Sequence, residues 1–297
     1  MTVLVVGATG FVGQQIAVSL KRRNHDVRGL VRGGARSPKA AGLLSAGVRV
    51  IEGDLRDPAT LASACSGVEA VVCTVTTMPT GADDGLRRVD HEGVLALMEA
   101  AEGAGVRKFV YTSYSGNLRT PSALETAKRE CEARLLRGRM QAVVLRPSYF
   151  MEVWLGPHLG VDPVNGSVRI YGSGNGKVSY ISGVNVAEYG VAAVERETGR
   201  QAVLEMGGPE ALSQLDAVRV FERVLGVSCR LEFVPVEALR ARHESPDPLQ
   251  NSFGALMLNY DAGDVIPGAA ALASEYGVTL RSVADYAATL RAPAAGV

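Results

Sequence analysis

The sequence carries no excess of either charge and has few aromatic residues. Its 297 residues include 31 Lys and Arg against 31 Asp and Glu, and aromatic side chains make up only 5%. Proteins that bind nucleic acid usually show a basic face with interspersed aromatic residues, and those that bind anionic membranes show a basic surface. We therefore expect neither nucleic acid nor a membrane as a partner.

Long hydrophobic runs and clustered cysteines are also missing. No apolar run approaches the roughly 20 residues that span a bilayer, and the chain starts on an apolar strand rather than a basic leader. A cytoplasmic location is the expectation. The four cysteines form no CxxC pair and have no histidine cluster nearby that would complete a zinc site. Buried, reduced thiols and no metal site are predicted at Cys65, Cys73, Cys131 and Cys229.

From Met1 to about Pro147, short Val-rich runs alternate with amphipathic segments. This alternation is typical of βαβ units, in which a parallel sheet is covered on both faces. The expected strands are Thr2 to Val6, Asp26 to Val31, Val48 to Ile51, Ala70 to Thr74, Lys108 to Thr112 and Ala142 to Leu145. The expected helices include Phe11 to Arg23, Gly85 to Gly103 and Ser122 to Arg137. The sequence thus predicts an α/β fold with a doubly wound parallel sheet of the Rossmann type.

The residue pattern changes in the second half of the chain, and it predicts a smaller α+β region there. Gly156 to Asn175 is rich in Gly, Pro and Asn, which indicates a functional loop region rather than one regular element. The further elements expected are a helix from about Asn185, a strand from Ala202 to Met206, a helix opened by the box Ser213 to Asp216, and a strand from Cys229 to Val234. An exposed linker or mobile loop is expected at His243 to Leu249, a cap at Thr279 for a last helix ending near Arg291, and a frayed end beyond it.

The strongest local signal is the segment Gly7 to Gly13, which follows the first strand and reads Gly-Ala-Thr-Gly-Phe-Val-Gly. Gly7 allows a tight turn, Gly10 lets the backbone approach a pyrophosphate, and Gly13 lets the helix pack close to the sheet. Free N–H groups at the helix start, together with the helix dipole, then hold the diphosphate. The sequence therefore predicts a dinucleotide site at this turn.

The end of the second strand indicates which dinucleotide is bound. An NAD-preferring fold usually places an acidic residue there to accept from the ribose 2′-hydroxyl. This sequence has Arg32 at that place and Arg36 in the following loop, and a guanidinium group pairs well with a 2′-phosphate. NADP(H) is therefore the predicted cofactor, and residues 1–150 are the predicted NADP-binding domain. Residues 151–297 are expected to form mainly a substrate-binding region, some of whose elements can rejoin the main sheet.

Three further segments give the chain a family resemblance. The fifth strand leads into Ser113, the next helix reads Leu124-Glu-Thr-Ala-Lys128, and the helix continues Lys128-Arg-Glu-Cys-Glu132. After the sixth strand the chain reads Leu-Arg-Pro-Ser-Tyr-Phe-Met-Glu, ending at Glu152. Together with the Gly-x-x-Gly-x-x-Gly spacing, these segments resemble the NmrA-like group of atypical short-chain dehydrogenases/reductases.

The resemblance implies roles for individual residues. Ser113 would orient a substrate carbonyl, Lys128 would hold the nicotinamide ribose, and Leu124 stands where most short-chain dehydrogenases/reductases have the proton-donating Tyr. Asp54 would accept from the adenine amine, Leu55 would contact the base, and Thr74 would contact the sugars. The catalytic candidates are Lys128, Ser113 and Tyr114. The cofactor-binding candidates are Gly7, Thr9, Gly10, Phe11, Val12, Gly13, Arg32, Asp54, Leu55, Thr74 and Lys128.

The resemblance and the missing Tyr leave more than one function open. The first is an NADPH-dependent reductase of a small apolar, aromatic, quinone-like or enone-like compound, whose reduced form takes its proton from water or Lys128. A non-catalytic NADP(H)-binding redox sensor is the alternative from another class, and a nucleotide-sugar epimerase or dehydratase is a weaker one. The residues expected to line the substrate pocket are Tyr149, Phe150, Met151, Trp154 and Tyr180.

Overall fold

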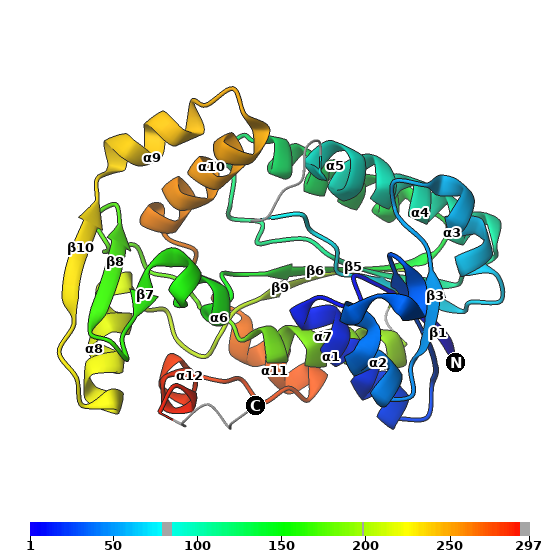
Figure 1. Ribbon diagram of the computed structural model, residues 1–297, viewed down its shortest axis with the longest axis horizontal. Helices are drawn as coiled ribbons and strands as arrows, with labels where there is room; N and C mark the ends of the chain where they lie inside the picture. The colour runs from blue at the N-terminus through cyan, green and yellow to red at the C-terminus, as the bar shows by residue number, and fades with distance from the viewer. Residues whose placement is uncertain (79–84, 198, 292–297) are drawn as a thin grey trace. The chain divides into compact units, whose positions relative to one another are not determined.

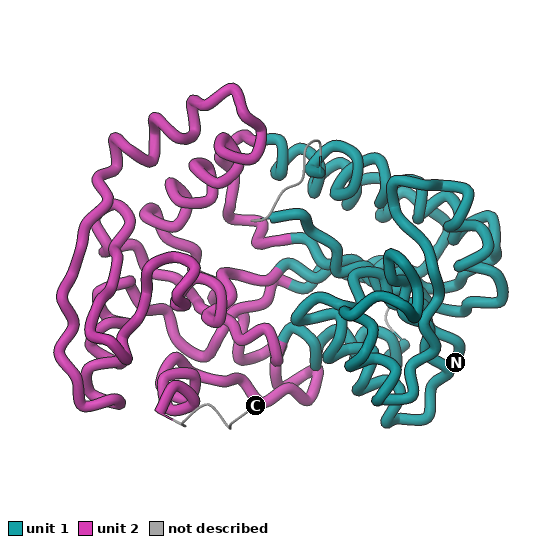
Figure 2. Tube along the Cα trace, viewed as in Figure 1, with its two compact units in different colours: residues 1–113, 123–146, 186–204 teal, residues 114–122, 147–185, 205–297 magenta. Residues whose placement is uncertain are grey.

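The computed structural model describes residues 1–78, 85–197 and 199–291, so the end predicted to fray, residues 292–297, lies outside the described residues. The chain divides into two compact units, each made of three segments (Figure 2). Unit 1 contains residues 1–113, 123–146 and 186–204, and unit 2 contains residues 114–122, 147–185 and 205–297. The chain therefore passes from one unit to the other several times.

Unit 1 is built on a seven-stranded sheet with the order β3-β2-β1-β4-β5-β6-β9. The neighbours from β3 to β6 all run parallel. Because the order reverses between β1 and β4, the sheet is doubly wound as predicted, with its switch point beside the glycine turn. The strands are β1 (Thr2–Val6), β2 (Asp26–Val31), β3 (Arg49–Glu52), β4 (Ala70–Cys73), β5 (Lys108–Thr112), β6 (Gln141–Pro147) and β9 (Gln201–Met206).

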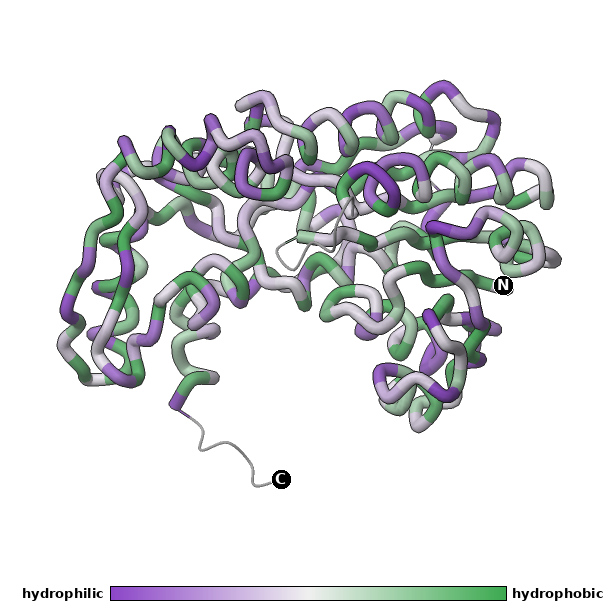
Figure 3. Tube along the Cα trace, turned by 45° about the horizontal axis from the view of Figure 1, so that its top comes forward, coloured by the Kyte–Doolittle hydropathy of each residue, from purple (hydrophilic) through white to green (hydrophobic). Residues whose placement is uncertain are grey.

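Helices cover both faces of this sheet (Figure 1). On one side lie α1 (Phe11–Arg22), α2 (Ala41–Ser45) and α7 (Gly183–Glu195), and on the other α3 (Pro58–Cys65), α4 (Glu92–Gly103) and α5 (Ala123–Arg137). Hydrophilic and hydrophobic residues alternate along these helices, as expected for helices with one face on a sheet (Figure 3). The start of α3 follows capping rules, because the Asp57 carboxylate accepts from the Ala59 N–H at 3.2 Å and Pro58 takes the first helical position.

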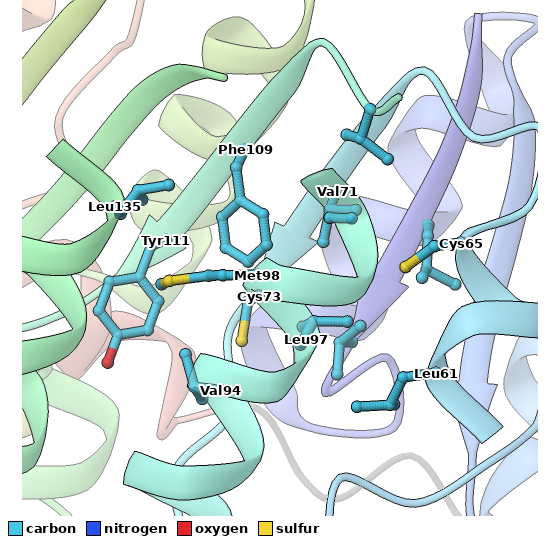
Figure 4. Packing of buried hydrophobic residues seen from close by; sticks show 14 of the residues in the cluster. Leu61, Cys65, Val71, Cys73, Val94, Leu97, Met98, Phe109, Tyr111 and Leu135 are labelled. Carbon is cyan, nitrogen blue, oxygen red and sulfur yellow. The ribbon is translucent and has the colours of Figure 1, made fainter. Parts of the chain in front are cut away.

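The core of unit 1 on the α4 side joins the sheet to the helices through side chains of different shapes. Phe109 and Tyr111 of β5 pack with Cys73 of β4 and Met98 of α4, and all four are fully buried (Figure 4). Burial raises the pKa of the Cys73 thiol to about 11 and that of Cys131 to about 12. These thiols are free and neutral near pH 7. Buried, reduced thiols are thus confirmed at Cys73, Cys131 and Cys65, whereas Cys229 is only half-buried.

The long helix predicted from Gly85 to Gly103 is interrupted. A π-helical turn, η3 (Leu86–His91), precedes α4, and its Asp90 is completely buried. A tertiary contact stabilises this π-helical turn. The Asp90 carboxylate accepts a hydrogen bond from the Thr77 N–H at 2.9 Å and another from the Thr77 hydroxyl at 2.6 Å. Turns of this kind are frequent at functional sites.

Unit 2 contains a small three-stranded sheet in the order β10-β8-β7, with β10 parallel and β7 antiparallel to β8. Its strands are β7 (Val161–Asp162), β8 (Ser167–Tyr171) and β10 (Arg230–Val234). Its helices are α6 (Met151–Trp154), α8 (Gln214–Leu225), α9 (Val236–His243), α10 (Pro248–Ala262), α11 (Ala269–Tyr276) and α12 (Val283–Thr289). Short 3-10 turns lie at Gly34–Arg36 and Pro38–Ala40 in unit 1 and at Pro157–Leu159 in unit 2.

Several expectations for this half of the chain were wrong. Gly156 to Asn175 is not one loop region, because β7 and β8 lie within it. The exposed loop expected at His243 to Leu249 is confirmed only for residues 244–247, because α9 ends at His243 and α10 starts at Pro248, the first helical position that proline favours. Asp247 caps this start by accepting from the N–H of the second and third helical residues.

The last helix is capped three residues later than predicted. Ser282 rather than Thr279 is the N-cap of α12, because the acidic residue of its capping box, Asp285, lies three residues beyond Ser282. The other capping box is confirmed, since Ser213 accepts from the Asp216 N–H at 3.1 Å at the start of α8.

Candidate functional site

The glycine turn of unit 1 leaves no room for side chains at two of its positions. Gly7 has φ +86°, and a Cβ there would lie 2.6 Å from Thr74 Oγ1. A Cβ at Gly13 would lie 2.2 Å from the Gly7 carbonyl oxygen, so α1 packs directly on the turn. Only glycine fits these two positions.

The N-terminus of α1 faces open space. A Cβ at Gly10 would meet only the Gly7 carbonyl oxygen, at 3.3 Å, and the Phe11 side chain is 50% exposed. Within the described part of the chain no side chain caps this end, and its first turn holds no acidic residue. The N–H groups and the helix dipole therefore offer an anion site, and a dinucleotide diphosphate fits it. Thr9 is half-buried and Val12 buried at the same turn.

Arg32 follows β2 directly and is exposed, as is Arg36. Between them the backbone turns through Gly33 at φ +75° and Gly34 at φ +59°. The structure also brings an acidic residue to this place, because Glu52 at the end of β3 pairs with Val31 and its side chain packs against Gly34. Sequence reasoning missed Glu52, since strand pairing rather than spacing puts it beside the end of β2.

The segment after β3 and the end of β4 lie close to the same edge of the sheet. Asp54 is half-buried and accepts from the Arg56 N–H at 3.0 Å, whereas Leu55 is buried and packs against Gly93 at the start of α4. The Thr74 hydroxyl lies under the glycine turn, 3.4 Å from the Val6 carbonyl oxygen to which it donates. Thr74 thus supports the turn from below, and its contact with a cofactor stays a prediction.

Lys128 is buried rather than exposed on α5. Its ammonium donates to the Val75 carbonyl at 3.0 Å and to the Thr112 carbonyl at 3.4 Å, and it lies 3.7 Å from the Asp90 carboxylate. The face of the Tyr111 ring is 5.2 Å away. Lys128 is therefore held at the carboxyl ends of β4 and β5, on the same edge as the glycine turn. Sequence reasoning gave Asp90 no role, because its pairing with Lys128 joins residues 38 positions apart in the chain.

The end of β5 carries two buried hydroxyl groups without a partner among the described residues, those of Thr112 and Ser113. The Ser113 backbone N–H donates to the Leu145 carbonyl at 2.8 Å, which fixes the residue on the sheet edge. A buried hydroxyl without a hydrogen bond is costly unless a ligand or water completes it. Leu124 is buried in the first turn of α5.

The second half of the Lys-x-x-x-Glu pattern belongs to an ion network in unit 1. Glu132 is 2% exposed, and its carboxylate accepts from Arg146 Nε at 3.2 and 3.1 Å and from Arg129 Nη1 at 2.6 Å. A second nitrogen of Arg146 contacts the same carboxylate. This network joins α5 to the end of β6.

The residues predicted to line the substrate pocket lie in unit 2, most of them in its core. Tyr149, Met151 and Tyr180 are buried, whereas Phe150 and Trp154 are half-buried. The Tyr149 ring centroid lies 4.4 Å from that of Trp154.

Tyr260 completes this aromatic cluster, and sequence reasoning did not single it out. Its ring centroid lies 5.0 Å from that of Tyr149 and 4.9 Å from that of Trp154, and its hydroxyl is hydrogen-bonded to that of Tyr180. Burial raises the pKa of Tyr149 and Tyr180 well above the ordinary value, so both phenols stay protonated. Contact of the cluster with a substrate stays a prediction.

Tyr114 opens the unit 2 segment 114–122, which buried polar groups hold in place. Asp264 is 1% exposed and accepts from the Ser115 hydroxyl at 2.7 Å and the Asn117 amide at 2.9 Å. Glu152, the last residue of the Leu-Arg-Pro segment, accepts the Gly183 N–H at 2.9 Å and so caps the start of α7. No helix in the described ranges has the length and apolar character that crossing a membrane requires.

A doubly wound sheet with a glycine turn at its switch point defines a dinucleotide-binding fold of the Rossmann type. The chain belongs to the NmrA-like family, whose model matches residues 1–266. The resemblance seen in the sequence is thereby confirmed.

Three known proteins illustrate the range of this similarity. A photosystem II assembly factor, Ycf39 of Synechocystis sp., is 30% identical over 81% of this chain and 72% of its own length. A (4-alkanoyl-5-oxo-2,5-dihydrofuran-3-yl)methyl phosphate reductase of Streptomyces griseus is 31% identical over 84% of each chain. The structure of an NADPH-dependent quinone oxidoreductase of Escherichia coli, complexed with NADPH, has a TM-score of 0.75 at 20% identity and covers 97% of this chain and 99% of its own.

Proposed function

We propose that the chain binds NADP(H) and is an NADPH-dependent reductase of a small apolar acceptor with aromatic, quinone-like or enone-like character. The observation that carries the proposal is the uncapped N-terminus of α1 above a glycine turn, on the sheet edge where Ser113 and Lys128 also lie. The reductase among the relatives, 31% identical, supports the reaction class.

In this proposal each part of the unit 1 edge holds one part of the cofactor. The N–H groups at the start of α1 bind the diphosphate, Arg32 binds the 2′-phosphate, and Asp54 with Leu55 binds the adenine. Lys128 and Thr74 lie toward the nicotinamide ribose. Residues 1–150, apart from the unit 2 residues 114–122 and 147–150, then form the NADP-binding domain. Residues 151–297 mainly take the substrate, and residues 186–204 return to unit 1.

When bound, NADPH supplies a hydride, and the chain has to place the acceptor and manage one proton. The Ser113 hydroxyl, which has no partner among the described residues, is available to an acceptor oxygen, and Leu124 supplies no proton. Acceptors whose reduced form is a stabilised anion are therefore favoured, since water or Lys128 can protonate such an anion. For a carbonyl acceptor, Tyr114, Tyr149 and Tyr180 are the candidate proton donors.

The first prediction is a pattern of acceptors. We expect the purified protein to oxidise NADPH with quinones or conjugated aromatic compounds and to do little with simple aliphatic ketones. Loss of NADPH absorbance over an acceptor panel measures this, with protein-free reactions as controls. The competing function is an NADP(H)-binding regulator without turnover, which the likeness to an assembly factor favours. Tight NADPH binding with no turnover across the whole panel would establish the regulator instead.

The second prediction concerns the choice of dinucleotide. The wild type should bind NADPH more tightly than NADH, and Arg32→Ala should remove about 1–3 kcal/mol of that preference by deleting a charge-assisted contact with the 2′-phosphate. Titration of both variants with both cofactors measures the preference. Arg49→Ala is the matched control, because Arg49 is an exposed arginine that pairs with Asp26 at the other end of the sheet. Equal wild-type affinity for NADPH and NADH would contradict the assignment.

A further inference from the structure

The buried ion pair of Lys128 and Asp90 lies beneath the proposed cofactor site. The two side chains are 5% and 0% exposed, and Nζ and Oδ1 are 3.7 Å apart. Either charge without the other would be buried and uncompensated, which proteins rarely tolerate. The pair is therefore one functional unit and not two independent residues.

The carboxylate of Asp90 is fixed on its other side. Its second oxygen, Oδ2, accepts both the N–H and the hydroxyl of Thr77, at 2.9 and 2.6 Å. Thr77 itself packs against the start of η3, because a Cβ at Gly85 would lie 3.0 Å from the Thr77 Cβ. Asp90 thus has its orientation set before any ligand is present.

One carboxylate consequently connects three segments that meet at the sheet edge. They are the chain leaving β4, the π-helical turn η3, and α5 with its lysine. The Lys128 ammonium also donates to the Val75 carbonyl, which belongs to the first of these segments. If Lys128 moved while Asp90 stayed in place, its ammonium would lose its contacts with both the Asp90 carboxylate and the Val75 carbonyl.

We propose that Asp90 is a positioning residue of the site: it holds the Lys128 ammonium at the carboxyl ends of β4 and β5, where it can reach the nicotinamide ribose. The inference rests on the proposed function, because it gives Asp90 a role only in a protein that binds NADP(H). Asp90 acts through Lys128 and does not itself contact the cofactor.

A double-mutant cycle on cofactor binding tests this role. The dissociation constant for NADPH is measured for the wild type, Asp90→Asn, Lys128→Met and the double variant. Asp90→Asn should weaken binding by roughly tenfold in the wild-type background, because the lysine loses its partner, and should have less than about a twofold effect when Lys128 is Met. Asp26→Asn is the control, since it removes a carboxylate from an exposed ion pair at the far end of the sheet.

A merely structural role for Asp90 would give the same loss in both backgrounds, and that result in a protein that binds NADPH overturns the positioning role alone. A wild type without affinity for NADPH overturns both this inference and the proposed function. If Asp90→Asn does not fold, Asp90→Glu keeps the charge but moves the carboxylate by one methylene. This variant should bind NADPH more weakly than the wild type only while Lys128 is present, and an equal weakening in the Lys128→Met background contradicts the proposal.

Discussion

Gly13→Ala is expected to abolish NADPH binding and to lower the free energy of unfolding by about 1–3 kcal/mol, the range for overpacking a tight site. The new methyl group would lie 2.2 Å from the Gly7 carbonyl oxygen and 2.7 Å from Thr74 Oγ1. The helix or the turn has to move, and the diphosphate site moves with it. Isothermal titration with NADPH and urea unfolding measure the two effects.

Alanine substitutions at two other glycines serve as controls, because they show whether the effect of Gly13→Ala comes from the steric clash or from alanine in general. Gly103→Ala should be neutral or raise stability by about 0.5–1 kcal/mol, because a Cβ at Gly103, the last residue of α4, would meet no atom of the described residues within 4 Å and alanine favours the helix. Gly10→Ala should keep the fold, since a Cβ there would meet only the Gly7 carbonyl oxygen among the described residues. It should weaken NADPH binding, because the methyl group would occupy the space in which the diphosphate binds. Unchanged NADPH affinity in Gly13→Ala would exclude the glycine turn as the cofactor site.

Glu132→Gln is expected to lower the free energy of unfolding by about 3 kcal/mol, because it removes the buried carboxylate charge that the Arg146 and Arg129 guanidinium groups share. The Glu132 side chain is only 3% exposed, and the side chains of both arginines are 23% exposed. Urea unfolding of the purified variant, without cofactor, measures the loss. The experiment concerns unit 1 alone and does not depend on any assigned activity.

The matched control is Glu102→Gln, in which the broken pair is more exposed. Glu102 and Arg134 are 25% and 36% exposed, so solvent already screens their attraction and the loss should stay below about 1 kcal/mol. The double variant Glu132→Met with Arg146→Met should lose less than the sum of the two single changes, because it removes both members of one buried ion pair together. Equal losses in Glu132→Gln and Glu102→Gln would show that burial of the network does not matter for stability.

The parallel sheet could be predicted closely from local sequence. The bounds of β1, β2 and β5 agree with prediction, because strands buried on both faces are continuous apolar runs between turn residues. The start of α1 at Phe11 follows from the glycine turn for the same local reason. In unit 2 the helices α9, α10 and α11 were not predicted. Pro246 and Pro248 suggested a linker from the sequence, although Pro248 is the first residue of α10.

The parts of the candidate site formed by residues close together in the sequence could be predicted. The parts formed by residues that the fold brings together from distant positions could not. The glycine turn and Lys128 were found from spacing and resemblance. Asp90 and Glu52 were missed, because their significance depends on a residue 38 positions away in one case and on the pairing of β3 with β2 in the other. The burial of Lys128 is equally non-local, since its three oxygen partners come from three separate segments of the chain.

The path of the chain between the two units also has a consequence for biosynthesis. The last strand of the large sheet, β9, pairs beside β6, but the ribosome makes it only after residues 147–185 of unit 2. A nascent polypeptide that has released β6 but not β9 holds an apolar strand with an unpaired edge, which is a hazard for aggregation. The sheet of unit 1 therefore cannot be completed during synthesis before residues 147–185 of unit 2 have been made.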